Sequence, residues 1–132
     1  MGGTGPGLKR DDPVLRAVPQ PADINTNGHI FGGWVLAQMD IAGGVVAHSR
    51  ARGPVATVAI EAMEFVRPIL LGDVVSLYGV IERVGRTSIA VRLEVVAARG
   101  YGDQAEQVLV TSGLFTYVAL DADHRPKPVP AG

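Results

Sequence analysis

The sequence contains no cysteine, and its 132 residues include only three phenylalanines, three tyrosines and one tryptophan. Without cysteine the chain forms no disulfide and has neither a thiol nucleophile nor a thiolate metal ligand. An excess of one charge is also missing, because 12 basic residues balance 13 acidic ones. This balance gives no global electrostatic attraction to nucleic acid or to a membrane surface. No apolar run reaches the roughly 20 residues that span a bilayer. We therefore expect a cytoplasmic protein without nucleic-acid or membrane partners.

The length of 132 residues fits one domain with a useful core. Residues 1–13 lack the apolar centre of a signal peptide, and we expect them to form a flexible leader. Residues 122–132 are rich in proline, which cannot donate to a sheet, and we expect them to form a tail. The folded domain is therefore expected over residues 14–121.

The most informative stretch runs from Asp23 to His48. Asp40 is the one ionisable residue between Ile30 and Ala47. A carboxylate in such apolar surroundings is costly unless a charged partner or hydrogen bonds compensate for its loss of hydration. Its presence therefore indicates either a specific structural partner or a chemical role.

A polar turn from Asp23 to Gly28 is expected to lead into a helix from about Gly33 to Ala47. Gly32 and Gly33 would lie at its start, where N–H groups have no intrahelical acceptor. Helical spacing puts mostly small residues on the face of Asp40, namely Gly33, Leu36, Gly43, Gly44 and Ala47. We expect the helix to be buried because it is apolar nearly all round, and we expect Gly43 and Gly44 to admit a backbone or a ligand beside the acid.

Five other segments have the composition of strands: Val14–Val18, Val55–Val66, Val74–Val84, Ser88–Val95 and Gln107–Leu120. Alternation in Ser88–Val95 predicts one buried and one wet face. The odd spacing of Glu61 and Glu64 predicts that they lie on opposite faces. The order of elements favours the α+β class, with an antiparallel sheet wrapped around one long helix. Its open edges would be satisfied by pairing two copies edge to edge.

Five segments occur in order between about Arg16 and Asp121: DINTNGHIFGGW, QMDIAGG, FVRPILLGDVV, VGRTS and FTYVALD. Together they resemble the hotdog-fold acyl-CoA thioesterases, in particular the small bacterial YciA-like branch. The resemblance implies hydrolysis of short to long acyl-CoA to free acid and coenzyme A. It implies no metal and no cofactor beyond the coenzyme A of the substrate. The homodimer would be the minimal unit, alone or in a trimer of dimers.

The resemblance also implies roles for single residues. Asp40 matches the catalytic carboxylate, acting as general base on water or as nucleophile. Asn25 matches its polar partner from across the subunit interface, and the Gly33 N–H would polarise the thioester carbonyl. The residues predicted to bind substrate are Gly32, His29, Arg67, Arg86, Thr87 and Ser88. His29 departs from the family, where Asp or Asn is common, and either tunes the site or is a partly exposed residue at the helix entry.

Two alternatives remain from the sequence. A hotdog enoyl-CoA hydratase or dehydratase would use His29 as base, and a non-catalytic acyl-CoA binding protein would keep the fold without turnover. Taken without the resemblance, Asp40 is as consistent with a structural acid as with a catalytic one. Arg125 and Lys127 in the tail are either solvated or contacts for the nucleotide end of coenzyme A.

Overall fold

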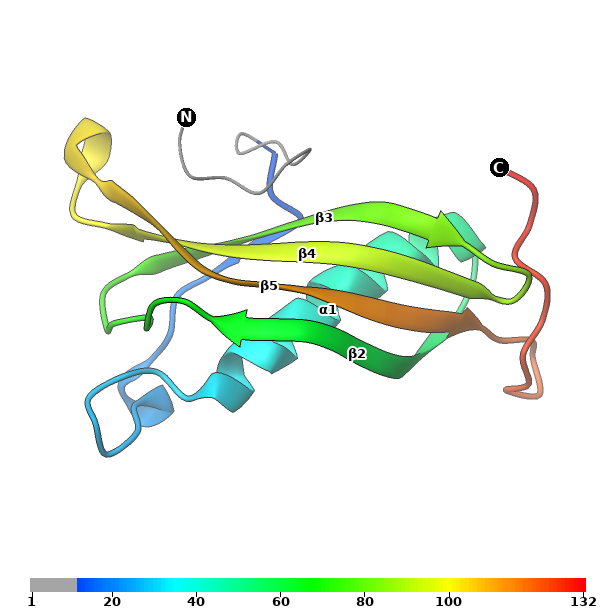
Figure 1. Ribbon diagram of the computed structural model, residues 1–132, viewed down its shortest axis with the longest axis horizontal. Coiled ribbons are helices and arrows are strands. Elements are labelled where there is room, and N and C mark those ends of the chain that lie inside the picture. Colours follow the sequence, from blue (N-terminus) through cyan, green and yellow to red (C-terminus); the bar gives the residue numbers. More distant parts are fainter. Residues whose placement is uncertain (1–11) are drawn as a thin grey trace.

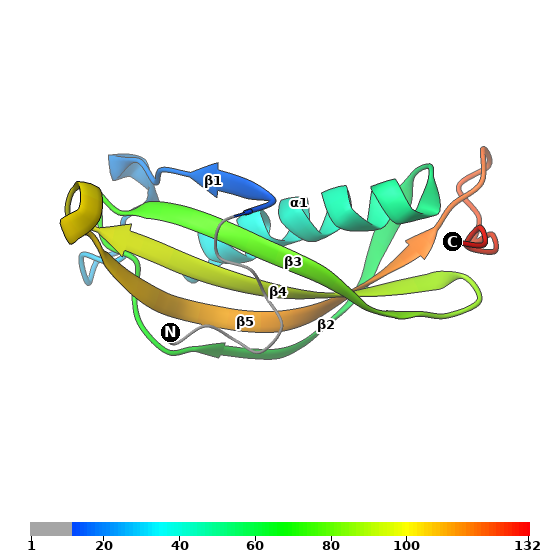
Figure 2. The same cartoon turned by 90° about the horizontal axis from the view of Figure 1, so that it is seen from above.

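The computed structural model describes residues 12–132, apart from the side chains of Ala62 and Met63, and places one long helix across one face of an antiparallel sheet (Figure 1). The elements are β1 (Leu15–Ala17), α1 (Gly32–Ala51), β2 (Val55–Phe65), β3 (Val74–Val84), β4 (Ser88–Arg99) and β5 (Glu106–Ala119), with short 3-10 turns at Pro21–Asp23 and Gly102–Gln104. The five strands lie in the order β1-β3-β4-β5-β2. The sheet curves along the helix (Figure 2). The α+β arrangement predicted from the sequence is confirmed.

Helix α1 begins at Gly32 and extends past the predicted end at Ala47 to Ala51. It ends because Arg52 takes the left-handed conformation, with φ of 56°, and its N–H donates to the His48 carbonyl oxygen. The predicted burial on all sides is wrong for the single chain. The sheet covers only one side of the helix, and Ile41 and Val45 on another side are each 54% exposed.

The predicted wet face of Ser88–Val95 is also wrong, although the strand itself is confirmed and extends to Arg99. Ala90 and Glu94 point to that face, yet each is only 2% exposed. The reason is that β4 is a central strand, so Glu94 lies between Tyr78 on β3 and Ser112 on β5. Alternation of apolar and polar residues indicates which face of a strand is buried in the core. It does not indicate how far side chains on neighbouring strands cover the residues of the other face.

Glu61 and Glu64 lie on the same face of the sheet, contrary to the prediction. Glu61 pairs with Leu114 and Glu64 pairs with Ser112, and these two partners are two residues apart on β5. Residues directly opposite each other in an antiparallel pair share a face. A bulge between the two glutamates adds one residue to β2 and changes the alternation. Both glutamates are exposed.

The C-terminal tail packs back on the domain. The Lys127 N–H donates to the Ala119 carbonyl oxygen at 2.9 Å, and the Val129 N–H donates to that of Arg86 at 2.8 Å. Arg50 at the end of α1 donates to the Pro130 carbonyl oxygen at 2.6 Å. The predicted leader, residues 1–13, lies almost wholly outside the described residues. Within the described part, no helix is long and apolar enough to cross a membrane.

Candidate active site

The Asp40 carboxylate lies halfway along α1, where two hydroxyl groups from the sheet hold it. The Thr57 hydroxyl donates to Asp40 Oδ1 at 2.6 Å. The Tyr117 hydroxyl lies 3.1 Å from the same Oδ1 and 3.0 Å from the main-chain oxygen of Asp40. Thr57 on β2 and Tyr117 on β5 are directly paired. The hydrogen-bond partners of this acid are therefore two side chains on neighbouring strands, which could not be identified from the sequence.

Gly43 makes room for Tyr117. A Cβ at this position would lie 2.2 Å from the tyrosine hydroxyl oxygen and 2.9 Å from its Cζ. The prediction that a backbone or a ligand occupies this space is wrong for Gly43, because a side chain of the same chain fills it. At Gly44 the nearest atom to such a Cβ, on the Tyr117 ring, is 4.0 Å away.

Tyr117 is suited to serve as a permanent donor. Its side chain is 1% exposed. Burial raises the pKa of the phenol far above its ordinary value, and the charge of Asp40 and the hydrogen bond to it raise this pKa further. The hydroxyl therefore keeps its proton at neutral pH and donates it toward the acid.

A cleft lies beside the start of α1 and brings four of the predicted residues together. It has a volume of about 250 Å³, and its polar lining includes Asn25, His29, Gly32 and Arg67. Its apolar walls are formed by Ile30, Val35, Phe65, Val66, Pro68, Ile69 and Val110. Apolar walls with a few polar groups are the usual lining of a site for an organic ligand. Asp40 is not among the residues that line this cleft.

Asn25 shapes the polar turn before the helix. Its Oδ1 accepts the N–H groups of Asn27 at 2.9 Å and His29 at 3.1 Å. Gly28 closes the turn with φ of +80°, a conformation that glycine adopts without strain. Among the described residues, none accepts a hydrogen bond from Asn25 Nδ2. The turn therefore uses the oxygen of this side chain and leaves its amide hydrogens for a ligand.

The N–H groups of Gly32 and Gly33 also lack acceptors in the described part of the chain. The next two N–H groups, of Trp34 and Val35, both point to the Phe31 carbonyl oxygen at 3.1 and 3.4 Å. A Cβ at Gly33 would have no atom within 4 Å. The surface beside Gly33 is thus open, and its N–H is ready for an acceptor from outside the chain.

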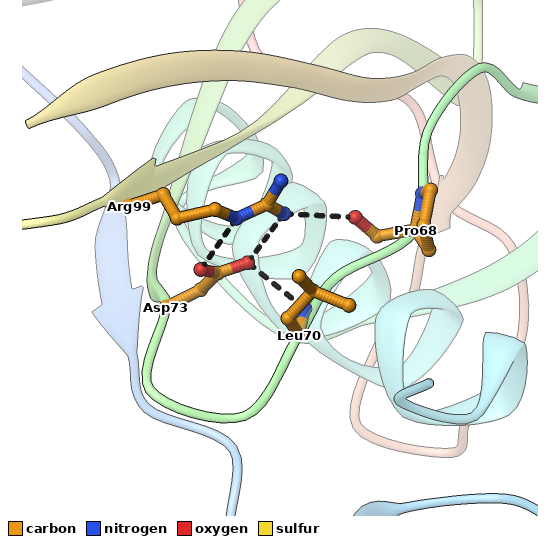
Figure 3. A network of polar contacts seen from close by, with 4 residues as sticks. All are labelled: Pro68, Leu70, Asp73 and Arg99. Atoms are coloured by element: carbon orange, nitrogen blue, oxygen red, sulfur yellow. Dashed lines mark hydrogen bonds and ion pairs between the residues drawn. The ribbon is translucent and has the colours of Figure 1, made fainter. Parts of the chain in front are cut away.

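An ion pair between the buried Asp73 and the partly exposed Arg99 fixes the loop that forms one wall of the cleft (Figure 3). Arg99 donates from Nε to Asp73 Oδ1 at 2.9 Å and from Nη2 to Oδ2 at 2.8 Å. Arg99 Nη2 also donates to the Pro68 carbonyl oxygen, and the Leu70 N–H donates to Asp73 Oδ2. The hydrogen bond with Asp73 raises the pKa of Arg99, which keeps its charge. The same loop is also tied to the segment before α1, because the Ile30 N–H donates a hydrogen bond to the Ile69 carbonyl oxygen at 3.0 Å.

The predicted catalytic residues do not meet within one chain. Gly33 and Asp40 are seven positions apart on α1, which corresponds to about 10 Å of helix rise. The predicted turn of Arg86, Thr87 and Ser88 lies at the other end of the domain, beside the end of α1 and the C-terminal tail (Figure 1). A single chain therefore holds the acid, the cleft and the turn as three separate groups.

Sequence reasoning missed Thr57 and Tyr117. They lie 17 and 77 positions from Asp40, so no local pattern joins them to it. One signal was present, because alternation in β5 places Tyr117 on the buried face with Phe115 and Ala119. A buried tyrosine hydroxyl usually has a hydrogen-bond partner.

Within residues 12–132, no group of three histidine or acidic side chains is placed to hold a metal ion. The expectation that the chemistry requires no metal stays a prediction.

Comparison with known proteins places this geometry in a family. The model of the thioesterase superfamily matches residues 27–102. The acyl-CoA thioester hydrolase YciA of Salmonella typhimurium is 46% identical over 121 residues, which cover 89% of each chain. Two solved structures are also similar. The hexameric hotdog fold thioesterase of Campylobacter jejuni has a TM-score of 0.85 and 38% identity, and the match covers 89% of this chain and 90% of that one. The hexameric thioesterase of Yersinia pestis has a TM-score of 0.86 and 38% identity, and the match covers 97% of this chain and 100% of that one.

The family model spans more than half of the 132 residues, and the identity to YciA extends over most of both chains. The chain therefore belongs to the thioesterase superfamily and has the hotdog fold.

Proposed function

We propose that this acyl-CoA thioester hydrolase performs its reaction at a site assembled from two subunits, with Asp40 from one and the helix start of the other. The observation that carries this proposal is the separation on α1. The acid accepts hydrogen bonds from Thr57 and Tyr117, while the free donors of Gly33 and Asn25 lie at the start of the helix and in the turn before it. A second copy of the chain is the simplest way to bring free N–H donors close to the acid.

The chemistry needs a base or nucleophile and a set of donors for the oxyanion. In the base route, Asp40 takes a proton from water while the water oxygen attacks the thioester carbonyl. The carbon–sulfur bond then breaks, and coenzyme A leaves with the proton. In the nucleophile route, Asp40 attacks the carbonyl itself, the carbon–sulfur bond breaks, and coenzyme A leaves as a thiolate that takes a proton from water. Water then hydrolyses the resulting anhydride and regenerates Asp40. In both routes the partner's Gly33 N–H and the partner's Asn25 Nδ2 stabilise the negative oxygen.

The exposed apolar surface of the chain supports a dimer. Ile41 and Val45 on α1 are each 54% exposed. On β2, which has a neighbour in the sheet on one side only, Val58, Ile60 and Phe65 are 57%, 47% and 47% exposed. A contact between two copies around a two-fold axis would bury both surfaces and pair the open edge.

Helix geometry relates this contact to the site. If the axis passes near Ala37, position 40 of one helix lies at the level of position 34 of its antiparallel partner. Asp40 would then lie beside the partner's Gly33, and two equal sites would form. The neighbouring structures from Campylobacter jejuni and Yersinia pestis are hexameric, which supports a trimer of such dimers.

Substrate binding follows from the same arrangement. The cleft with Asn25, His29, Gly32 and Arg67 is placed to receive part of the acyl-CoA, and the cationic Arg67 suits its phosphates. The turn with Arg86, Thr87 and Ser88 is the proposed contact for the coenzyme A portion. These roles, and the cytoplasmic location, stay predictions from the sequence.

The test is release of free thiol from acyl-CoA substrates of increasing chain length, measured with a thiol reagent. Replacing Asp40→Asn keeps the shape of the side chain but removes its basicity. We expect kcat to fall by about 10³-fold, within the usual range for loss of a general base. The exposed acid Asp103 is the control, and Asp103→Asn should leave the rate unchanged. Full hydrolysis by Asp40→Asn would refute the role of this acid.

A further inference from the structure

We propose that Thr57 and Tyr117 are positioning residues that hold the Asp40 carboxylate by one oxygen, Oδ1, and so assign Oδ2 as the oxygen that reacts. This inference rests on the proposed function, because it takes Asp40 as the reacting acid. It adds which atom of the acid is used and which side chains orient it.

Both donors converge on the same atom. The Thr57 hydroxyl at 2.6 Å and the Tyr117 hydroxyl at 3.1 Å both lie at Oδ1. Within residues 12–132, no donor reaches Oδ2. A hydroxyl bonded to a carboxylate at about 2.6 Å is in the range of strong, charge-assisted hydrogen bonds. Oδ1 is therefore occupied, and Oδ2 keeps its lone pairs for water or for a carbonyl carbon.

The two donors are themselves fixed. Tyr117 is 1% exposed, and its hydroxyl lies against the backbone of α1 in the space left by Gly43. Thr57 is directly opposite Tyr117 in the β2–β5 pair. Strand pairing thus places the two residues that carry the hydroxyls side by side, and the helix brings Asp40 to both.

Holding one oxygen stops rotation of the carboxylate about its Cβ–Cγ bond. Oδ2 then points in one direction whether or not substrate is bound. Misplacement of a reacting group by about 1 Å can cost 10²-fold in rate. Loss of Thr57 or Tyr117 should therefore raise the energy of the transition state and leave the affinity for acyl-CoA nearly unchanged.

The experiment compares Tyr117→Phe and Thr57→Val, which each delete one hydroxyl, with Thr57→Ser, which keeps it. We expect kcat to fall about 10-fold or more for each deletion while KM stays within about twofold, the pattern of an interaction needed only in the transition state. Thr57→Ser should recover most of the lost rate. Tyr101→Phe is the matched control, because Tyr101 is 91% exposed.

A double-mutant cycle distinguishes positioning from a general structural role. If Tyr117 acts through Asp40, then Tyr117→Phe has no further effect on the residual rate of Asp40→Asn. An equal fold loss in both backgrounds, or an unchanged kcat in Tyr117→Phe and Thr57→Val with normal thermal unfolding, would overturn the inference. The proposed function fails separately, through full activity of Asp40→Asn alone.

Discussion

At the scale of the residue, Gly43 is the position where one missing methyl group determines the geometry of the acid. Tyr117 approaches the helix because the glycine has no side chain, and the phenol then reaches both Oδ1 and the main-chain oxygen of Asp40. The neighbouring Gly44 has no such close contact. Two adjacent glycines that look equivalent in the sequence thus have different roles.

Replacing Gly43→Ala should destabilise the fold and slow hydrolysis. The new Cβ would overlap the Tyr117 hydroxyl, and relieving such overpacking costs about 1–3 kcal/mol. Gly44→Ala is the control, and it should be neutral or stabilising by up to about 1 kcal/mol, because alanine is the better helix former. Urea unfolding and thiol release measure the two effects. Equal stability of the two variants would contradict the packing described for Tyr117.

Single residues of the site were also the hardest feature to predict from the sequence. It identified Asp40 through the absence of other charges nearby, and Asn25 and Gly33 through the family resemblance. It could not identify Thr57 and Tyr117, because their proximity to the acid depends on strand register and on the packing of α1 against the sheet.

At the scale of the element, the loop between β2 and β3 connects the core to the cleft. Asp73 is 1% exposed and binds Arg99 on β4 through two hydrogen bonds (Figure 3). The loop carries Arg67, Pro68 and Ile69 into the lining of the cleft. This ion pair therefore stabilises the fold and also fixes one wall of the cleft.

Replacing Asp73→Asn should destabilise the protein by about 1.5–3 kcal/mol, the usual cost of losing hydrogen bonds between charged groups, because the Arg99 side chain left without its partner is 30% exposed. The control is Glu82→Gln, which breaks the exposed pair between Glu82 and Arg92. That change should cost at most about 1 kcal/mol. Denaturant unfolding compares the two variants, and similar losses of stability would show that the loop does not depend on Asp73.

The positions of the elements were largely predictable, whereas their exposed faces were not. Composition and turn residues indicated the helix and the strands, since these signals are local. The shielding of Glu94 and the common face of Glu61 and Glu64 depend on neighbouring strands and on a bulge. The one-sided burial of α1 depends on where the sheet ends.

At the scale of the whole molecule, the proposed sharing of each site between two copies has a measurable consequence for mixtures of variants. Asp40→Asn removes the acid of one subunit, and Asn25→Ala removes the donor that the proposed site takes from the partner. A hybrid dimer of these two variants contains one site with both residues intact and one site with neither.

Refolding an equal mixture of the two inactive variants should therefore restore about one quarter of the wild-type rate, since half of the dimers are hybrids and each has one intact site of two. Each variant refolded alone serves as the control. A mixture no more active than the two controls would indicate that each site belongs to a single chain.

The bulges in β2 determine which of its side chains face the proposed contact between two subunits. Thr57, Ile60 and Phe65 pair with Tyr117, Phe115 and Thr111, all buried residues, so all three point to the side of the sheet that carries the helix. Strict alternation from Thr57 would instead have turned Glu61 toward that side. The extra residue at Val58 resets the phase of the strand and keeps the carboxylate out of the apolar contact. The bulge is therefore itself under constraint: the same eleven residues of β2 paired without it would place the Glu61 carboxylate on the side of the sheet where two subunits are proposed to meet.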